Sequence, residues 1–315
     1  MANKNNCDSR RAFLRKAGGL LLASGIGIPQ VLRAQSTFSN PVGYAAISWP
    51  SDQFDDAIVD ISALGFRGVQ MLGSTLKSYG SRVETLKARL DILKLKPAAL
   101  SCSGVSPNPA RASNDSAQFK RYVAFMKHLG GKNLQITDGG RPGRNYSARE
   151  IRALGAHMNE LGKLARSSGL VMGYHPHFGT LGETRKGLGK VLGATSPKDV
   201  KLIADVARLT LGGCDPAEVI RSYHDRLLFV HFKDVRKDVL AQARRNRNLV
   251  RKSHDLFCVI GQGGVDFPPI LKALRDTHFS GWVIVELGAY KVPPGGPAVS
   301  ARMNLEAMRR MGFKV

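Results

Sequence analysis

Short apolar runs alternate with longer segments of helical periodicity along most of this chain. The short runs are rich in Val, Ile and Leu, the pattern of strands that are buried on both faces. In the longer segments, apolar residues recur every three to four positions, as in amphipathic helices. The predicted strands are 42–48, 67–72, 97–103, 132–137, 169–175, 200–205, 226–232 and 281–287. The predicted helices lie near 53–64, 81–95, 115–129, 147–167, 185–193, 215–223, 267–276 and 299–311.

Glycines separate several of these helices from the next strand. Gly65, Gly130 and Gly169 stand at such points, and glycine readily takes the left-handed conformation that ends a helix. Eight strand–helix repeats favour a closed parallel barrel. A doubly wound open sheet is the alternative, but no GxGxxG sequence opens a helix after the first strand. We therefore predict a single (β/α)8 TIM barrel over residues 35–315.

The first 34 residues follow a different pattern. Residues 9–16 read SRRAFLRK and precede a Gly- and Ala-rich apolar run that ends near Pro29. Paired arginines before such a run are typical of a bacterial twin-arginine signal, and Ala34 is a suitable cleavage point. The run is too short to span a membrane. We predict export to the periplasm with no stable membrane anchor after cleavage; an ordinary amphipathic helix is the alternative.

Charge and cysteine content limit the other classes of partner and fold. The 47 Lys and Arg outnumber the 24 Asp and Glu, which gives a net charge of +23. Because these positive charges are scattered, they favour a generally basic surface over a dedicated nucleic-acid site. The densest group is a helical, basic insertion within 235–258. The three cysteines after the predicted signal exclude a disulfide framework but leave a single bridge open; they are Cys102, Cys214 and Cys258.

Metal-ligating residue types mark the ends of four consecutive predicted strands. In a parallel barrel these ends surround one mouth, so we expect their side chains to converge. The residues are His175, His177, Asp205, His231 and Glu286. A mixed set of nitrogen and oxygen ligands suits Mn²⁺, Co²⁺, Zn²⁺ or Mg²⁺, with positions left open for substrate oxygens. The sequence therefore predicts a divalent metal site at the mouth of the barrel.

The sequence around these residues resembles a known family. GYHPHFGTLGET, FVHFKDVRKDV, GQGGVDFPPIL and GWVIVEL are similar to the sugar isomerase/epimerase superfamily with its xylose isomerase-like barrel. Together with the early ISWPSD segment, they are most similar to its inosose dehydratase branch. The resemblance covers roughly residues 42–312 and implies a keto-sugar or keto-polyol substrate. A metal polarises the carbonyl, a base removes the α-proton, and an enediolate forms.

The resemblance also implies the metal ligands and the reaction type. Asp205, His231 and Glu286 match metal ligands of the family. His175 takes the fourth position, where many relatives have a Glu that binds metal and acts as a base. Glu286 then remains as the one clear carboxylate base. Single-sided enolisation followed by elimination, a dehydratase (lyase) reaction, therefore fits better than two-base isomerisation or epimerisation.

Three further residues are expected to act on the substrate. Lys233 could hold an enediolate oxygen or pair with the adjacent Asp234. His177 could orient the substrate or support a metal ligand. Glu183 could reach the mouth from the loop after the fifth strand, or be an ordinary acid at a helix start.

The expected substrate contacts are Trp49, Gln70, Arg208 and Gln262. Relatives usually carry a Glu at the position of Gln70 and a His at that of Arg208, so we expect a substrate other than inosose. Arg208 would suit a carboxylate or phosphate, or it points to solvent. A 3-keto-glycoside cleaved in the periplasm would satisfy both the chemistry and the predicted location.

Two other functions are considered. Apurinic endonucleases share this barrel, and the charge suits nucleic acid, but their metal centre needs more histidines than these strand ends provide. A non-catalytic sugar-binding barrel is the second alternative. The oligomeric state is left open, a homo-oligomer included.

Overall fold

The computed structural model describes residues 37–102, 104–139, 146–250, 255–288 and 295–315. The predicted signal, residues 1–34, lies outside this part of the chain. Phe38–Val315 form one unit. Within the described ranges, no helix has both the length and the apolar character needed to cross a bilayer.

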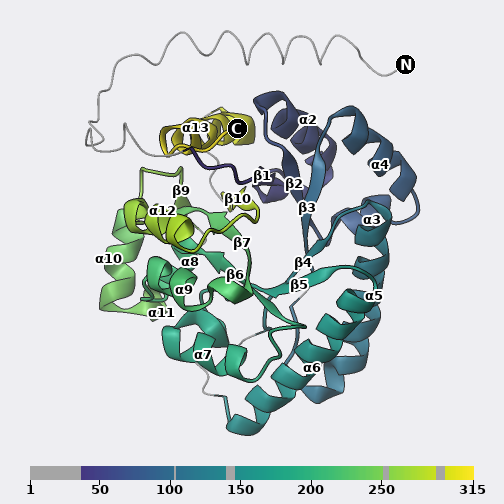
Figure 1. Cartoon of the computed structure of the whole chain (residues 1–315), viewed down its shortest axis with the longest axis vertical. Coiled ribbons are helices and arrows are strands. Elements are labelled where there is room, and N and C mark those ends of the chain that lie inside the picture. Colours follow the sequence, from purple (N-terminus) through teal and green to yellow (C-terminus); the bar gives the residue numbers. More distant parts are fainter. Residues whose placement is uncertain (1–36, 103, 140–145, 251–254, 289–294) are drawn as a thin grey trace. The chain divides into compact units, whose positions relative to one another are not determined.

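Eight parallel strands close into a barrel (Figure 1). They are β1 (Val42–Ala45), β2 (Gly68–Leu72), β3 (Lys96–Ser101), β4 (Asn133–Ile136), β5 (Val171–Tyr174), β6 (Lys201–Asp205), β7 (Leu227–Phe232) and β10 (Val283–Val285). Around the barrel the order is β1-β10-β7-β6-β5-β4-β3-β2, and β1 pairs with both β10 and β2. The sheet has no free edge, so the predicted (β/α)8 barrel is confirmed.

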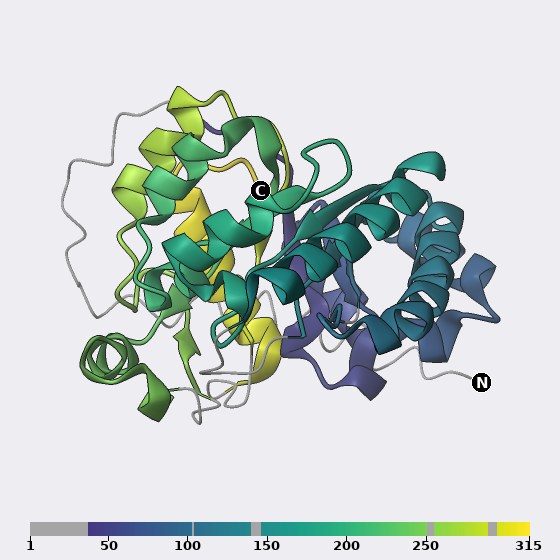
Figure 2. The ribbon, with the colours of Figure 1, turned by 90° about the horizontal axis from the view of Figure 1, so that it is seen from below.

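Helices surround these strands, as Figures 1 and 2 show. Those at the predicted positions are α2 (Phe54–Leu64), α4 (Val83–Ile92), α5 (Ala112–His128), α6 (Ala148–Ser167), α7 (Arg185–Gly193), α9 (Pro216–Ser222), α12 (Phe267–Asp276) and α13 (Gly296–Arg310). Two short helices were not predicted, α3 (Thr75–Tyr79) and α8 (Val206–Leu211). Short 3-10 turns occur at Ala46–Ser48, Ser51–Gln53, Pro109–Arg111, Leu181–Glu183 and His224–Arg226.

Local sequence explains where several helices begin and end. Ser147 and Glu150 form a reciprocal capping box at the start of α6. Gly65, Gly130 and Gly169 have φ values of 97°, 75° and 78°. This left-handed conformation strains other residues and confirms the role predicted for these glycines.

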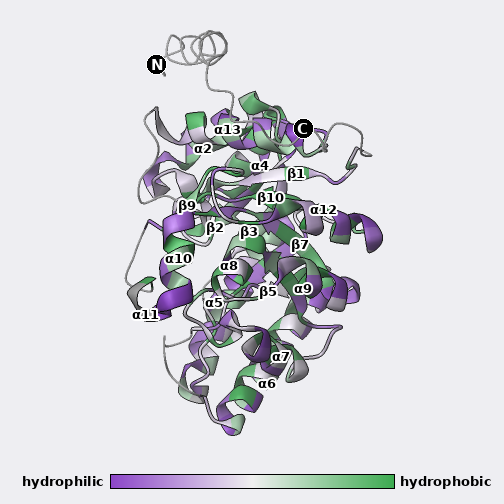
Figure 3. Cartoon of the chain, turned by 90° about the vertical axis from the view of Figure 1, so that its left-hand side faces the viewer, coloured by the Kyte–Doolittle hydropathy of each residue, from purple (hydrophilic) through white to green (hydrophobic). Residues whose placement is uncertain are grey.

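The core has two layers. Small and branched side chains fill the barrel interior; they are Ala45, Ala98, Ala99, Ile203, Phe229 and Ile284. A larger cluster lies between the strands and the surrounding helices. Figure 3 shows the strands as mainly hydrophobic and the helices as mixed, which is the amphipathic pattern read from the sequence.

The basic insertion forms a small substructure beside the mouth. Strands β8 (Asp234–Val235) and β9 (Phe257–Cys258) pair in antiparallel fashion. Between them lie α10 (Lys237–Arg245) and α11 (Arg247–Val250), so the predicted helical character is confirmed. Asp234 fixes the following loop, because its carboxylate accepts hydrogen bonds from the backbone amides of Gly261, Gly263 and Val265 at 2.9–3.0 Å.

Candidate active site

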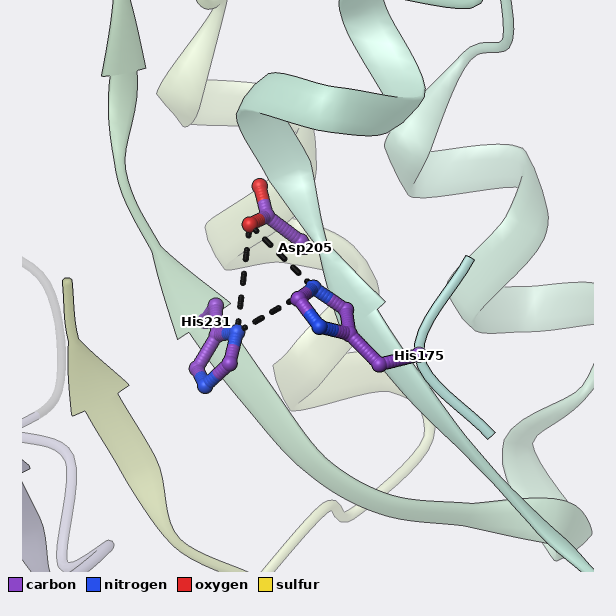
Figure 4. A group of neighbouring side chains, drawn as sticks. All are labelled: His175, Asp205 and His231. Atoms are coloured by element: carbon purple, nitrogen blue, oxygen red, sulfur yellow. Dashed lines mark hydrogen bonds and ion pairs between the residues drawn. The ribbon is translucent and has the colours of Figure 1, made fainter. Parts of the chain in front are cut away.

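Three fully buried side chains converge where β5, β6 and β7 end (Figure 4). His175 Nε2 lies 3.4 Å from Asp205 Oδ2 and 3.4 Å from His231 Nδ1. His231 Nδ1 lies 3.8 Å from the same Asp205 oxygen. Each residue thus offers one ligand atom, and the three atoms lie within 4.8 Å of one another. We call these residues the His–Asp–His cluster.

The charge states of the cluster fit a divalent metal. Burial lowers the pKa of His175 and lowers that of His231 to about 4, so both imidazoles are neutral at pH 7. Burial opposes ionisation of Asp205, but Lys233, His175 and Arg208 outweigh it and hold its pKa well below the usual value. Neutral imidazoles and an ionised carboxylate are the forms that bind metals.

Glu286 follows β10 and lies next to the cluster. Its Oε2 is 3.6 Å from His231 Nδ1, while its Oε1 is paired with the buried Lys233. Burial alone would raise the pKa of Glu286, but Lys233 and His231 lower it to about 2. The structure therefore brings the four predicted ligands together, with one Glu286 oxygen engaged by a lysine.

Lys233 is held by Glu286 and an aromatic ring. Its Nζ also lies 3.9 Å from Asp205 Oδ2 and 3.8 Å from the centroid of the Phe257 ring. Of the two alternatives for Lys233, pairing with Asp234 is wrong. The Asp234 carboxylate instead accepts hydrogen bonds from backbone amides. The ammonium group therefore belongs to the site.

Gln70 supports His231. Its Oε1 lies 2.7 Å from His231 Nε2, and its amide nitrogen donates to Ser101 Oγ at 2.7 Å and to Gln135 Oε1 at 3.1 Å. These bonds make Nε2 the protonated nitrogen of His231 and leave the lone pair of Nδ1 facing the cluster. Gln70 is buried and contacts a candidate metal ligand; its contact with substrate stays a prediction.

His177 and Arg208 also face the cluster. His177 Nε2 lies 3.1 Å from His175 Nδ1, and burial holds the pKa of His177 well below its usual value. The backbone amide of Arg208 donates to Asp205 Oδ1 at 2.9 Å, and its Nε lies 3.4 Å from Asp205 Oδ2. Because the Arg208 side chain is only 14% exposed, it does not point to solvent.

Trp49 and Gln262 lie in other surroundings. The Trp49 indole is buried, donates to Asp60 Oδ2 at 3.2 Å and packs edge-on against Tyr44. These contacts place the ring between β1 and α2, and its contact with substrate stays a prediction. Gln262 is exposed, in the turn after β9, and its contact with substrate stays a prediction.

Glu183 joins two loops. Its Oε2 accepts a 2.7 Å hydrogen bond from the amide of Gly179, and its Oε1 lies 3.8 Å from a nitrogen of Arg247 in the insertion. Glu183 precedes the first turn of α7, so these contacts are not those of an acid at a helix start, and a catalytic role stays a prediction. Cys102, Cys214 and Cys258 are free thiols, so no bridge joins them.

Sequence reasoning missed Gln135, Ser101 and Phe257. A detectable signal existed for Gln135, because a polar residue inside an otherwise apolar strand has to find a buried partner. Phe257 gave no such signal, since its contact with Lys233 depends on how the insertion folds back.

Comparisons with known proteins agree with this fold. The chain matches the xylose isomerase-like TIM barrel family over residues 58–311. An inosose dehydratase of Lacticaseibacillus casei is 27% identical over 291 residues, which cover 84% of this chain and 96% of that protein.

Two solved structures share the fold. The crystal structure of the IOLI protein with a bound zinc atom has a TM-score of 0.72 at 15% identity, and the match covers 86% of this chain and 98% of that one. The 3-keto-D-glucoside 4-epimerase of E. coli has a TM-score of 0.66 at 18% identity, covering 86% and 99%. The family match covers most of the chain, and the strands form the closed barrel of that family. This chain therefore belongs to the xylose isomerase-like TIM barrel family.

Proposed function

We propose that this protein is a divalent-metal-dependent enzyme that removes an α-proton from a keto-sugar or keto-polyol, most simply as a dehydratase. The observation that carries this proposal is the His–Asp–His cluster with the ionised Glu286 beside it. The similarity of this chain to inosose dehydratases supports the same chemistry.

Each step can be assigned to groups of this chain. His175, Asp205 and His231 would hold the ion, which supplies polarisation of the substrate carbonyl when bound. Glu286 Oε2 would accept the α-proton, and Lys233 Nζ would donate a hydrogen bond to the oxygen that becomes negative. In dehydration the C–H bond breaks, a C=C bond forms, and the β-hydroxyl leaves. Glu286 can return its proton to that hydroxyl, which departs as water.

One base therefore serves both halves of an elimination. An isomerase or epimerase would need a second group to deliver a proton to another carbon or to the opposite face. His177 is the remaining candidate, but its Nε2 is engaged with His175. A non-catalytic sugar-binding barrel is the alternative that deuterium uptake separates, and isomerisation differs from dehydration in giving a product that retains the β-hydroxyl.

The test is deuterium uptake from solvent at the α-carbon of a panel of keto-sugars and inososes. We expect uptake that a chelator removes and that Glu286→Gln abolishes. Glu306→Gln, an exposed position on α13, is the matched control and should retain uptake. Uptake that survives both chelation and Glu286→Gln would contradict the mechanism, and binding without uptake would favour the non-catalytic barrel.

A further inference from the structure

Arg208 is a buried cation that the reaction described above does not use. Its Nε is buried and makes no hydrogen bond with any described residue. The side chain is 14% exposed, and a guanidinium stays charged at every accessible pH. Burying such a charge is costly unless an anion compensates for it.

Asp205 provides only part of that compensation. The oxygen that lies 3.4 Å from Arg208 Nε, Oδ2, is also the oxygen that faces His175, His231 and Lys233, at 3.4, 3.8 and 3.9 Å. A carboxylate that binds a metal ion has its charge offset by that ion. The carboxylate next to the Arg208 guanidinium is therefore the one whose charge the metal ion would offset.

A count of charges gives the same result. Asp205 and Glu286 carry two negative charges, while Lys233 and Arg208 carry two positive charges. A divalent ion would make this group positive by two. A neutral keto-sugar leaves this total unchanged, because the proton that it loses would stay on Glu286, so both positive charges would stay uncompensated.

An aromatic ring of the insertion contacts the guanidinium. The Phe257 ring of β9 lies 5.3 Å from Arg208 Cζ and 3.8 Å from Lys233 Nζ. Contact with one aromatic face leaves the edge of the guanidinium, with its paired N–H groups, for an anion. A planar fork of donors matches a carboxylate or phosphate group.

We propose that the substrate carries an anionic group, a carboxylate or a phosphate, and that Arg208 binds it. This inference rests on the proposed function, because it concerns the substrate of the same site. It makes Arg208 a specificity-determining residue that distinguishes acidic sugars from neutral ones.

The test measures dissociation constants with the full-length, manganese-loaded protein and two matched pairs of probes. One pair is 5-keto-D-gluconate and L-sorbose, which differ by a carboxylate. The other is D-fructose 6-phosphate and D-fructose, which differ by a phosphate. We expect the anionic member of at least one pair to bind about tenfold or more tightly than its neutral partner. The pair that shows the preference identifies the anion.

Substitution then assigns the preference to Arg208. Arg208→Gln should remove it by weakening the anionic probe while leaving the neutral probe nearly unchanged. Arg208→Lys should retain part of it, because it keeps the charge and loses the fork. Arg310→Gln, at an exposed position on α13, should retain all of it.

Three results would overturn the inference: no anionic preference in either pair, no binding of either anionic probe, or equal weakening of both members by Arg208→Gln. Equal weakening with a parallel loss of manganese affinity would mean that Arg208 only orients Asp205. These measurements do not depend on turnover. An anionic preference without deuterium uptake would therefore reject the proposed reaction and keep the inference.

Discussion

At the scale of single residues, the His–Asp–His cluster is supported by hydrogen bonds that lie behind it. Gln70 accepts from His231 Nε2 and is itself held by Ser101 and Gln135. Without that acceptor, His231 could place its proton on either nitrogen and rotate away from the cluster.

We therefore expect Gln70→Leu to weaken manganese binding by about tenfold to a hundredfold. Titration against a competing chelator measures this change, and ¹⁵N spectra of labelled histidine report which nitrogen of His231 is protonated. Gln242→Leu, at an exposed position on α10, serves as the control. Unchanged affinity and an unchanged tautomer in Gln70→Leu would show that Gln70 does not orient the ligand.

Which residues form the cluster could be predicted because a barrel brings consecutive strand ends to one mouth. The roles of Trp49 and Gln70 could not be predicted in this way. Both lie near strand ends, but whether a side chain faces the mouth or the layer behind it depends on how each loop turns. For Trp49 the deciding contact is Asp60 on α2, and nothing in the local sequence specifies that pairing.

At the scale of elements, the loop after β9 depends on one carboxylate. Asp234 accepts hydrogen bonds from the amides of Val235, Gly261, Gly263 and Val265. Because this side chain is fully buried, its loss would leave several buried amides without an acceptor.

Asp234→Ala should accordingly lower the free energy of unfolding by about 2–4 kcal/mol. Chemical denaturation measures the difference, with the exposed Asp238→Ala as the comparison. A loss in Asp234→Ala no larger than that in Asp238→Ala would contradict the role assigned to this carboxylate.

The eight strands and the long helices were predictable because burial on both faces and helical periodicity leave distinct patterns. Helices α3 and α8 were not predictable, because five or six residues span too few turns to show a helical period. Strand ends also differ by up to three residues from the prediction. Apolar residues continue past the last ladder hydrogen bond, as at Leu287 after β10.

At the scale of the whole molecule, we propose that the protein works outside the cytoplasm. The paired Arg10 and Arg11 before a Gly- and Ala-rich run support this, although they lie outside the described residues. Replacing both with lysine should keep a reporter fusion in the cytoplasmic fraction of a bacterium with the twin-arginine system. Arg33→Lys should leave export unchanged. Equal export of both variants would contradict the proposed location.

The central claim is that the His–Asp–His cluster holds a divalent ion. Elemental analysis of protein reconstituted with manganese, cobalt or zinc and then desalted tests it most directly, with His231→Ala as the comparison. We expect about one bound ion per chain for the natural sequence and the loss of most of that bound metal in His231→Ala. Protein that retains no ion, or a variant that retains as much as the natural chain, would contradict it.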